Sequence, residues 1–69
     1  MKVTAPMSGS VWKITSESGK QVEAGETIVI LESMKMEIPI TAETGGTVKT
    51  ISVQEGDFIQ EHDVVAIIE

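Results

Sequence analysis

Short runs of alternating hydrophobic and polar residues follow one another along the chain, with turn-forming Gly, Ser and Ala between them. The pattern predicts strands over residues 10–15 and 27–31, a brief extended piece at Val22, and turns at 18–19 and 24–25. The second half of the chain shows the same order of runs between residues 47 and 68. We therefore expect an all-β protein built from short strands.

The same alternation predicts the direction of the single tryptophan. In SVWKI, Val11 and Trp12 point to opposite faces of the strand, as Val48 and Lys49 do in TVKTI. Because the valines are the natural core residues, Trp12 is expected on the outer face or at an edge. There it is either a partly covered surface residue or an anchor for a partner.

The chain contains an internal repeat. Without gaps, APMSGSVWKITSESGKQVEAGETIVILE aligns with AETGGTVKTISVQEGDFIQEHDVVAIIE at an offset of 37 residues (42 − 5 = 37). Identical pairs include Ala5/Ala42, Gly9/Gly46, Val11/Val48, Ile14/Ile51, Gly19/Gly56 and Glu32/Glu69, and Ile30 also matches Ile67. One copy alone could not bury its apolar face, so each must cover the other. We expect a single domain, residues 1–69, with pseudo-twofold halves at about 5–32 and 42–69.

Composition supports strands and excludes several kinds of site. Nine Ile and eight Val against one Leu, with seven Thr, are the β-branched bias of sheets, and the absence of Cys excludes disulfides. No His, Asp and Glu cluster with metal-ligand spacing surrounds His62, so no metal site is expected. His62 aligns with Gly25 in a tight turn, which predicts a positive φ for the histidine.

Net charge and hydropathy argue against nucleic acids and membranes as partners. The net charge of −6, with one Trp and one Phe, argues against nucleic-acid binding. No apolar run has the length of about 18 to 20 residues that a membrane span needs, and no charged-then-apolar leader opens the sequence. The expectation is a soluble, cytoplasmic protein that does not bind membranes.

Lys35 stands out in the segment ESMKMEIPI, residues 32–40. The repeat places it in the link between the halves, at the tip of a hairpin over residues 33–38, and predicts the chain termini at the opposite pole. A two-residue hairpin normally needs Asn-Gly or a similar pair, so Met34 and Lys35 are poor turn formers. Poor turn formers in a tight turn are expected where function constrains the sequence. In a longer, unstrained loop, Met34 and Lys35 would not be unfavourable and would indicate nothing about function.

No self-contained active site is apparent, because no acidic pair has a pocket or a general-base neighbour. An enzyme is therefore the weakest hypothesis. A small β-barrel that binds a partner protein through the hairpin or an edge strand would explain the fold, but it would not explain the lysine.

The segment ESMKME, with APMSGSV upstream and GGTVKTI downstream, resembles the biotinyl domain of biotin-dependent carboxylases over essentially the whole chain. The resemblance implies a flattened barrel of two four-stranded antiparallel sheets, a barrel-sandwich hybrid, with the lysine hairpin at one end. The biotin carriers of bacterial acetyl-CoA carboxylase typically have an extra thumb loop in the first half. The gapless repeat leaves no room for that loop here.

Carried over from this family, Lys35 is the residue to which a biotin protein ligase attaches biotin. The implied recognition hairpin consists of the residues around the lysine: Glu32, Ser33, Met34, Met36 and Glu37. The two methionines either pack against the ligase and partner enzymes or simply cover the end of the barrel.

The resemblance also implies a non-catalytic carrier that shuttles carboxyl groups between a biotin carboxylase and a carboxyltransferase. Lipoyl domains share the fold, but usually have Asp before the lysine and a small residue after it. Met34 and Met36 therefore favour biotin. Stand-alone biotin/lipoyl attachment proteins are similar over their full length, so lipoate, with a lipoyl ligase or transferase and 2-oxo acid dehydrogenases as partners, is the alternative.

Overall fold

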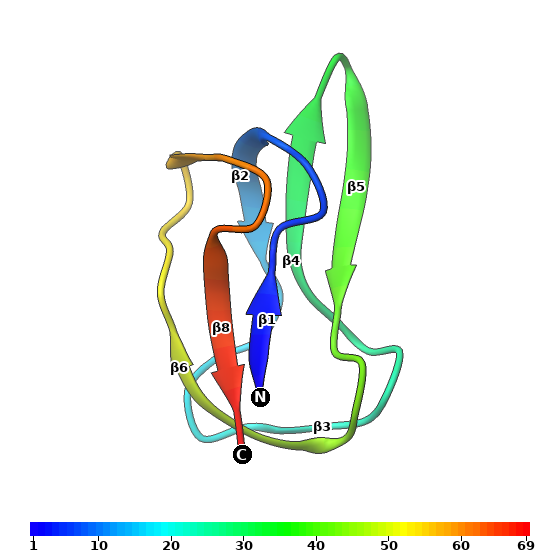
Figure 1. The fold of residues 1–69 in the computed structure, drawn as a ribbon, viewed down its shortest axis with the longest axis vertical. Helices are drawn as coiled ribbons and strands as arrows, with labels where there is room; N and C mark the ends of the chain where they lie inside the picture. The colour runs from blue at the N-terminus through cyan, green and yellow to red at the C-terminus, as the bar shows by residue number, and fades with distance from the viewer.

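A computed structural model describes the whole chain, residues 1–69, and it is all-β (Figure 1). The strands are β1 Lys2–Thr4, β2 Gly9–Ile14, β3 Gln21–Val22, β4 Thr27–Ser33, β5 Met36–Thr41, β6 Gly46–Ile51, β7 Phe58–Ile59 and β8 Val64–Ile68. No helix in the structure is long and apolar enough to span a membrane.

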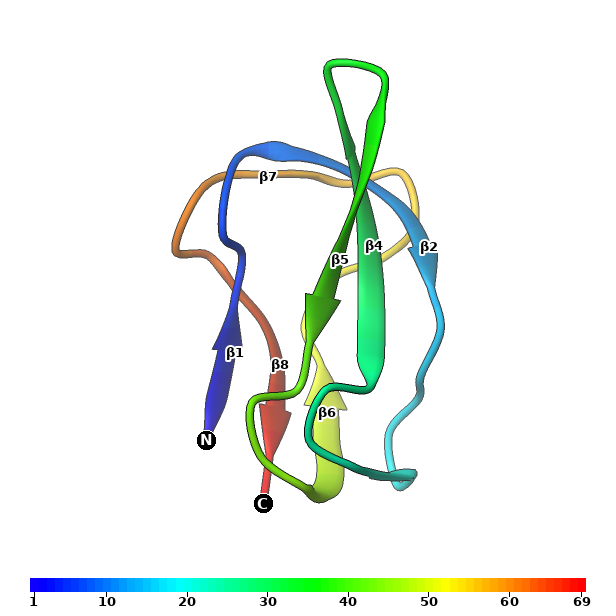
Figure 2. The same ribbon diagram turned by 90° about the vertical axis from the view of Figure 1, so that its right-hand side faces the viewer.

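The strands form two four-stranded antiparallel sheets, in the orders β1-β8-β6-β3 and β5-β4-β2-β7. The short strand β3 crosses one end of the molecule in Figure 1, and β7 crosses the other end in Figure 2. This arrangement confirms the expected flattened barrel of two sheets. We call the sheet that contains β4 and β5 the hairpin sheet and the other one the terminal sheet.

The two sheets repeat one another residue by residue. Val11 pairs with Leu31 in the hairpin sheet, and Val48 pairs with Ile68 in the terminal sheet, each shifted by 37 (48 − 11 = 37, 68 − 31 = 37). The bulges repeat too, because the register shifts between Val11 and Lys13 and again between Val48 and Thr50. The structure therefore has the pseudo-twofold symmetry that the sequence repeat predicts.

The core lies between the sheets and takes side chains from both halves. Its buried members are Val3, Ala5, Val11, Val22, Ile28, Val29, Leu31, Ile40, Ala42, Val48, Val53, Ile59, Val65, Ala66 and Ile68. Trp12 is 49% exposed while its neighbour Val11 is buried, as alternation predicts. Neither half could bury these residues alone, so the halves stabilise each other by covering one apolar surface with another.

Turn chemistry also follows the repeat. Gly19 and Gly56 have φ of 90° and 94°, and Gly25 has φ of 89°. His62, at the position equivalent to Gly25, has φ of 75°, which confirms the prediction for this residue. The histidine is thus explained by a left-handed backbone position, which His adopts more readily than most residues.

The strands β1 and β5 are the elements that the sequence pattern did not specify. Strand β1 has three residues, too few for a reliable pattern, and β5 contains Pro39, which lacks a backbone donor. Pro39 is tolerated because β5 is an edge strand. These two strands are equivalent by the repeat, since each pairs with the last strand of a half.

Candidate functional site at the lysine hairpin

The hairpin formed by β4 and β5 projects beyond the rest of the molecule (Figures 1 and 2). Its outermost pairs are Glu32 with Glu37 and Ser33 with Met36, and only Met34 and Lys35 lie in the turn. The two chain ends lie at the other end of the long axis in Figure 1, as the repeat predicts. Nothing in the fold therefore covers the turn.

The turn has the backbone of a primed β-turn, the type whose twist suits a two-residue hairpin. Met34 has φ of 52° and Lys35 has φ of 65°, so both central residues are left-handed. A side chain with a Cβ costs about 1–2 kcal/mol in this region, and neither residue can form the local hydrogen bonds that help Asn or Asp there. The chain thus has two unfavourable turn residues at the tip of its projecting hairpin.

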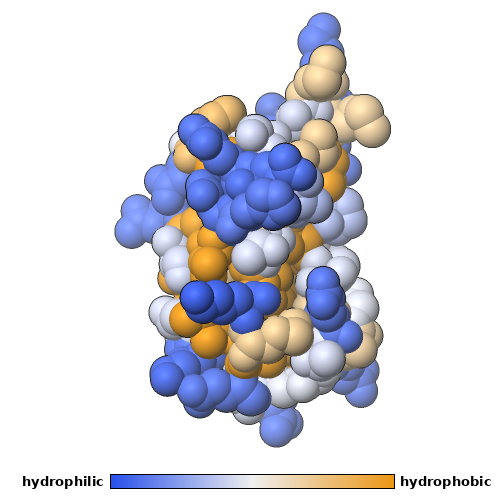
Figure 3. All heavy atoms as spheres, viewed as in Figure 1, coloured by the Kyte–Doolittle hydropathy of each residue, from blue (hydrophilic) through white to orange (hydrophobic).

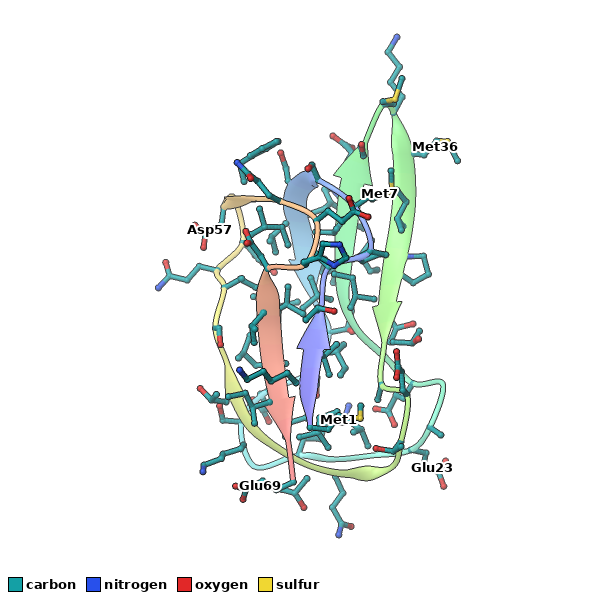
Figure 4. The ribbon with its side chains drawn as sticks, in the orientation of Figure 1. Met1, Met7, Glu23, Met36, Asp57 and Glu69 are labelled. Carbon is teal, nitrogen blue, oxygen red and sulfur yellow. The ribbon has the colours of Figure 1, made fainter.

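Side chains at the tip are directed into solvent. Met34 is 89% exposed and Met36 is 63% exposed, and Lys35 is also exposed. Figure 3 shows hydrophilic atoms at the end of this projection with weakly hydrophobic atoms beneath them, and Figure 4 shows Met36 directed away from the barrel. Most of each methionine side chain is therefore free of the barrel, and contact with a ligase or partner enzymes stays a prediction.

The amine of Lys35 is available for reaction. The ion pairs of the molecule join Lys20 to Glu26, Lys49 to Glu69 and His62 to Glu61, and none involves Lys35. No group of three or more His, Cys, Asp or Glu residues could hold a metal ion. Neither of the two surface hollows is lined by a residue between 32 and 37. The Lys35 amine is thus in no ion pair and beside neither hollow.

The base of the hairpin is held by β2. Ser10 pairs with Glu32, and Gly9 lies so close that a Cβ added there would be 2.9 Å from the Glu32 carbonyl oxygen and 3.4 Å from the Ser33 Cβ. Glycine is required for this approach. The hairpin is therefore rooted in the sheet, and only its last turn stands free.

Two carboxylates frame the lysine. Glu32 and Glu37 are cross-strand partners and both are exposed. Like charges directly opposite each other destabilise a sheet slightly, so stability of the fold does not explain this pair. The structure thus brings all the predicted recognition residues together around Lys35, with the acidic pair as the second pair below the turn.

Comparison with known proteins agrees with this geometry. The family model described as "Biotin-requiring enzyme" matches residues 1–68. The biotin/lipoyl attachment protein of Bacillus subtilis is 49% identical over 65 residues, which span 94% of this chain and 89% of that protein. The biotinylated protein TB7.3 homolog of Mycobacterium leprae is 44% identical over 66 residues, 96% of this chain and 93% of that protein.

A solved structure extends the similarity to a large carboxylase. The crystal structure of Kluyveromyces lactis urea carboxylase matches 100% of this chain with a TM-score of 0.95 and 33% identity, although the match is only 6% of that protein. The fold, the projecting hairpin and these relatives lead to one conclusion. The chain belongs to the biotin/lipoyl family of carrier domains and is homologous to the biotin carrier domains of carboxylases.

Proposed function

We propose that the protein carries biotin in amide linkage to the amine of Lys35. The observation that carries this proposal is the turn itself, in which Met34 and Lys35 hold left-handed backbone positions at the exposed pole of the molecule. A turn selected for stability would have Asn-Gly here. Retention of a lysine at the tip is explained if an enzyme must reach its amine.

Attachment is an acyl transfer performed by a biotin protein ligase. The ligase activates the biotin carboxylate as an acyl-adenylate, and the neutral Lys35 amine attacks its carbonyl carbon. An amide bond forms, AMP leaves with the electron pair of the broken bond, and the amine loses a proton. The turn residues Met34 and Lys35 supply no second base, so we assign uptake of that proton to the ligase. The net charge of the carrier changes from −6 to −7.

Once modified, the domain acts as a swinging arm. A biotin carboxylase adds a carboxyl group to the biotin ring, and a carboxyltransferase passes it to an acceptor. Tethering makes each encounter between ring and active site effectively intramolecular, which raises the local concentration of biotin. The carrier itself supplies no catalytic group to either step. Similarity to a segment of urea carboxylase supports partners of the carboxylase class.

Lipoate on the same lysine is the second candidate, and the name of the Bacillus subtilis relative includes both groups. Under this alternative a lipoyl ligase or transferase modifies Lys35, and the partners are 2-oxo acid dehydrogenases or related systems. We favour biotin because methionine flanks Lys35 on both sides, at Met34 and Met36.

A competition experiment separates the two groups. The purified chain is incubated with ATP, biotin, lipoate, a biotin protein ligase and a lipoyl ligase, and its intact mass is measured over time. We expect the mass of the biotinyl form to dominate and Lys35→Arg to remain unmodified. A lipoyl mass alone would move the protein to the second candidate. A chain that stays unmodified would refute both and favour a protein-binding module.

A further inference from the structure

The outer face of the hairpin sheet carries four adjacent apolar side chains, which we call the aromatic patch: Trp12, Ile30, Pro39 and Phe58. Strand pairing brings them together. Ile30 of β4 pairs with Pro39 of β5 on one side and with Lys13, next to Trp12, on the other. Phe58 of β7 pairs with Ser10 of β2, one step diagonally from Trp12. Trp12 is 49% exposed and Phe58 is 68% exposed.

The terminal sheet shows that the fold does not need this patch. At the equivalent positions it has Lys49 for Trp12, Lys2 for Pro39 and Gln21 for Phe58. Only Ile30 keeps its type, as Ile67. Figure 3 shows hydrophilic side chains lying across the hydrophobic atoms on the side of the molecule where β8 and β1 lie. Lys49 forms an ion pair with Glu69 at 2.9 Å.

The patch lies beside the lysine hairpin and has an acidic border. Phe58, Ser10, Glu32 and Glu37 form the next row along the sheet toward the turn, so the two carboxylates lie between the rest of the patch and Lys35. On the opposite side, a Glu55 carboxylate oxygen accepts a hydrogen bond from the Ile14 backbone N–H at 3.2 Å. Lys13 is the one basic residue on the four strands of this sheet.

We propose that the aromatic patch and its acidic border form the surface on which the biotin protein ligase docks. This inference rests on the proposed function of Lys35 and adds where the modifying enzyme binds. Before modification the reactive amine is on the domain itself, so the ligase must approach as closely as one lysine side chain allows. The biotin carboxylase and the carboxyltransferase act after modification, and they reach the biotin ring at the end of the longer biotinyl-lysine side chain. A surface contiguous with the hairpin therefore suits the ligase best.

The chemistry of the surface defines its partner. An exposed Trp beside a Phe is the kind of anchor that dominates protein interfaces, while charges at the rim steer association. The matching ligase surface is an apolar depression bordered by Lys or Arg. Docking of a second copy of this chain is opposed by the net charge of −6 and by the shared acidic border.

The test is steady-state biotinylation by a bacterial biotin protein ligase, followed by intact mass. The double variant Trp12→Gln/Phe58→Gln removes the aromatic rings without changing the charge. The matched control, Lys49→Arg/Gln21→Ser, alters the equivalent positions of the terminal sheet, also without changing the charge. Thermal unfolding confirms that each variant is folded. We expect the patch variant to raise KM about tenfold with kcat unchanged, since loss of an interface anchor weakens binding.

Three results overturn the inference. Unchanged KM in the patch variant would exclude ligase docking while leaving Lys35 as the biotin site. An equal rise of KM in the terminal-sheet control would show that the effect is not specific to the patch. Absence of biotin on the parent protein would refute the proposed function and this inference together. A KM of the parent that rises with salt concentration would support the acidic border as part of the interface.

Discussion

The two poles of this molecule have the same strand pairing, and one of them carries the projecting hairpin. At one pole, β4 and β5 continue past the barrel and join through Met34 and Lys35. At the other pole, β8 and β1 pair in the same register. Ile68 and Met1 exchange backbone hydrogen bonds. Leu31 and Ile38, the equivalent residues by the repeat, are paired in the same way in the hairpin sheet. What distinguishes the hairpin pole is a turn whose two central residues, Met34 and Lys35, are both left-handed and both poor turn formers.

The largest expected effect tests whether the halves share one core. Leu31 and Ile68 are equivalent and both are buried. Leu31→Ala and Ile68→Ala should each lower the free energy of unfolding by about 2–5 kcal/mol, because each leaves a cavity in the common core. Urea denaturation followed by Trp12 fluorescence measures both values. Two separate transitions, or a loss in only one variant, would contradict a shared core.

Gly9 and Gly46 are equivalent by the repeat, but only Gly9 lies at the base of the lysine hairpin. A Cβ at Gly9 would lie 2.9 Å from the Glu32 carbonyl oxygen, and one at Gly46 would lie 2.6 Å from the Glu69 carbonyl oxygen. Gly9→Ala and Gly46→Ala should each destabilise the protein by about 1–3 kcal/mol through overpacking. Only Gly9→Ala should also slow biotinylation, since only this change displaces the base of the hairpin. Equal biotinylation rates for the two variants would contradict this role of Gly9.

Ser16 is a place where the repeat is imperfect. It is buried, its hydroxyl has no hydrogen-bond partner, and its equivalent in the other half is the equally buried Val53. We expect Ser16→Val to raise the free energy of unfolding by about 1–2 kcal/mol, because an unsatisfied buried hydroxyl is removed. Val53→Ser is the reciprocal control and should be destabilising. A stability loss in Ser16→Val would show that the hydroxyl has a partner in solution.

The smallest effect concerns the turn. Met34→Asn should stabilise the protein by about 1 kcal/mol, because Asn tolerates a positive φ better than Met does. Met36→Asn lies in a strand and should bring no such gain. Thermal unfolding measures both variants. If Met34→Asn were neutral or destabilising, Met34 would not be a strained residue, and the contrast between the poles would lose its energetic basis.

Much of this architecture could be predicted from the sequence because the sequence contains an internal repeat. The offset of 37 residues predicts the equivalence of the sheets, the positive φ of His62 and the position of Lys35 at a free pole, and each is found. The local pattern alone did not specify β1 or β5, since one is short and the other contains a proline.

The sequence predicted one of the two aromatic residues of the aromatic patch. Trp12 was predicted to point outward, but Phe58 was not singled out, because the two residues are 46 positions apart (58 − 12 = 46) and meet only through the pairing of β2 with β7. A signal was present in the repeat: Ile59 aligns with Val22, so the residue before it must face outward where the other half has Gln21. Comparing the two halves position by position would have found it.

Peptide mapping of the biotinylated protein tests the central claim most directly. The chain contains five lysines, Lys2, Lys13, Lys20, Lys35 and Lys49, and all except Lys35 lie on the barrel. We predict that biotin is found on Lys35 alone and that Lys35→Arg removes it completely while the protein stays folded. Biotin on any other lysine, or modification that persists in Lys35→Arg, would contradict the assignment of the hairpin as the attachment site.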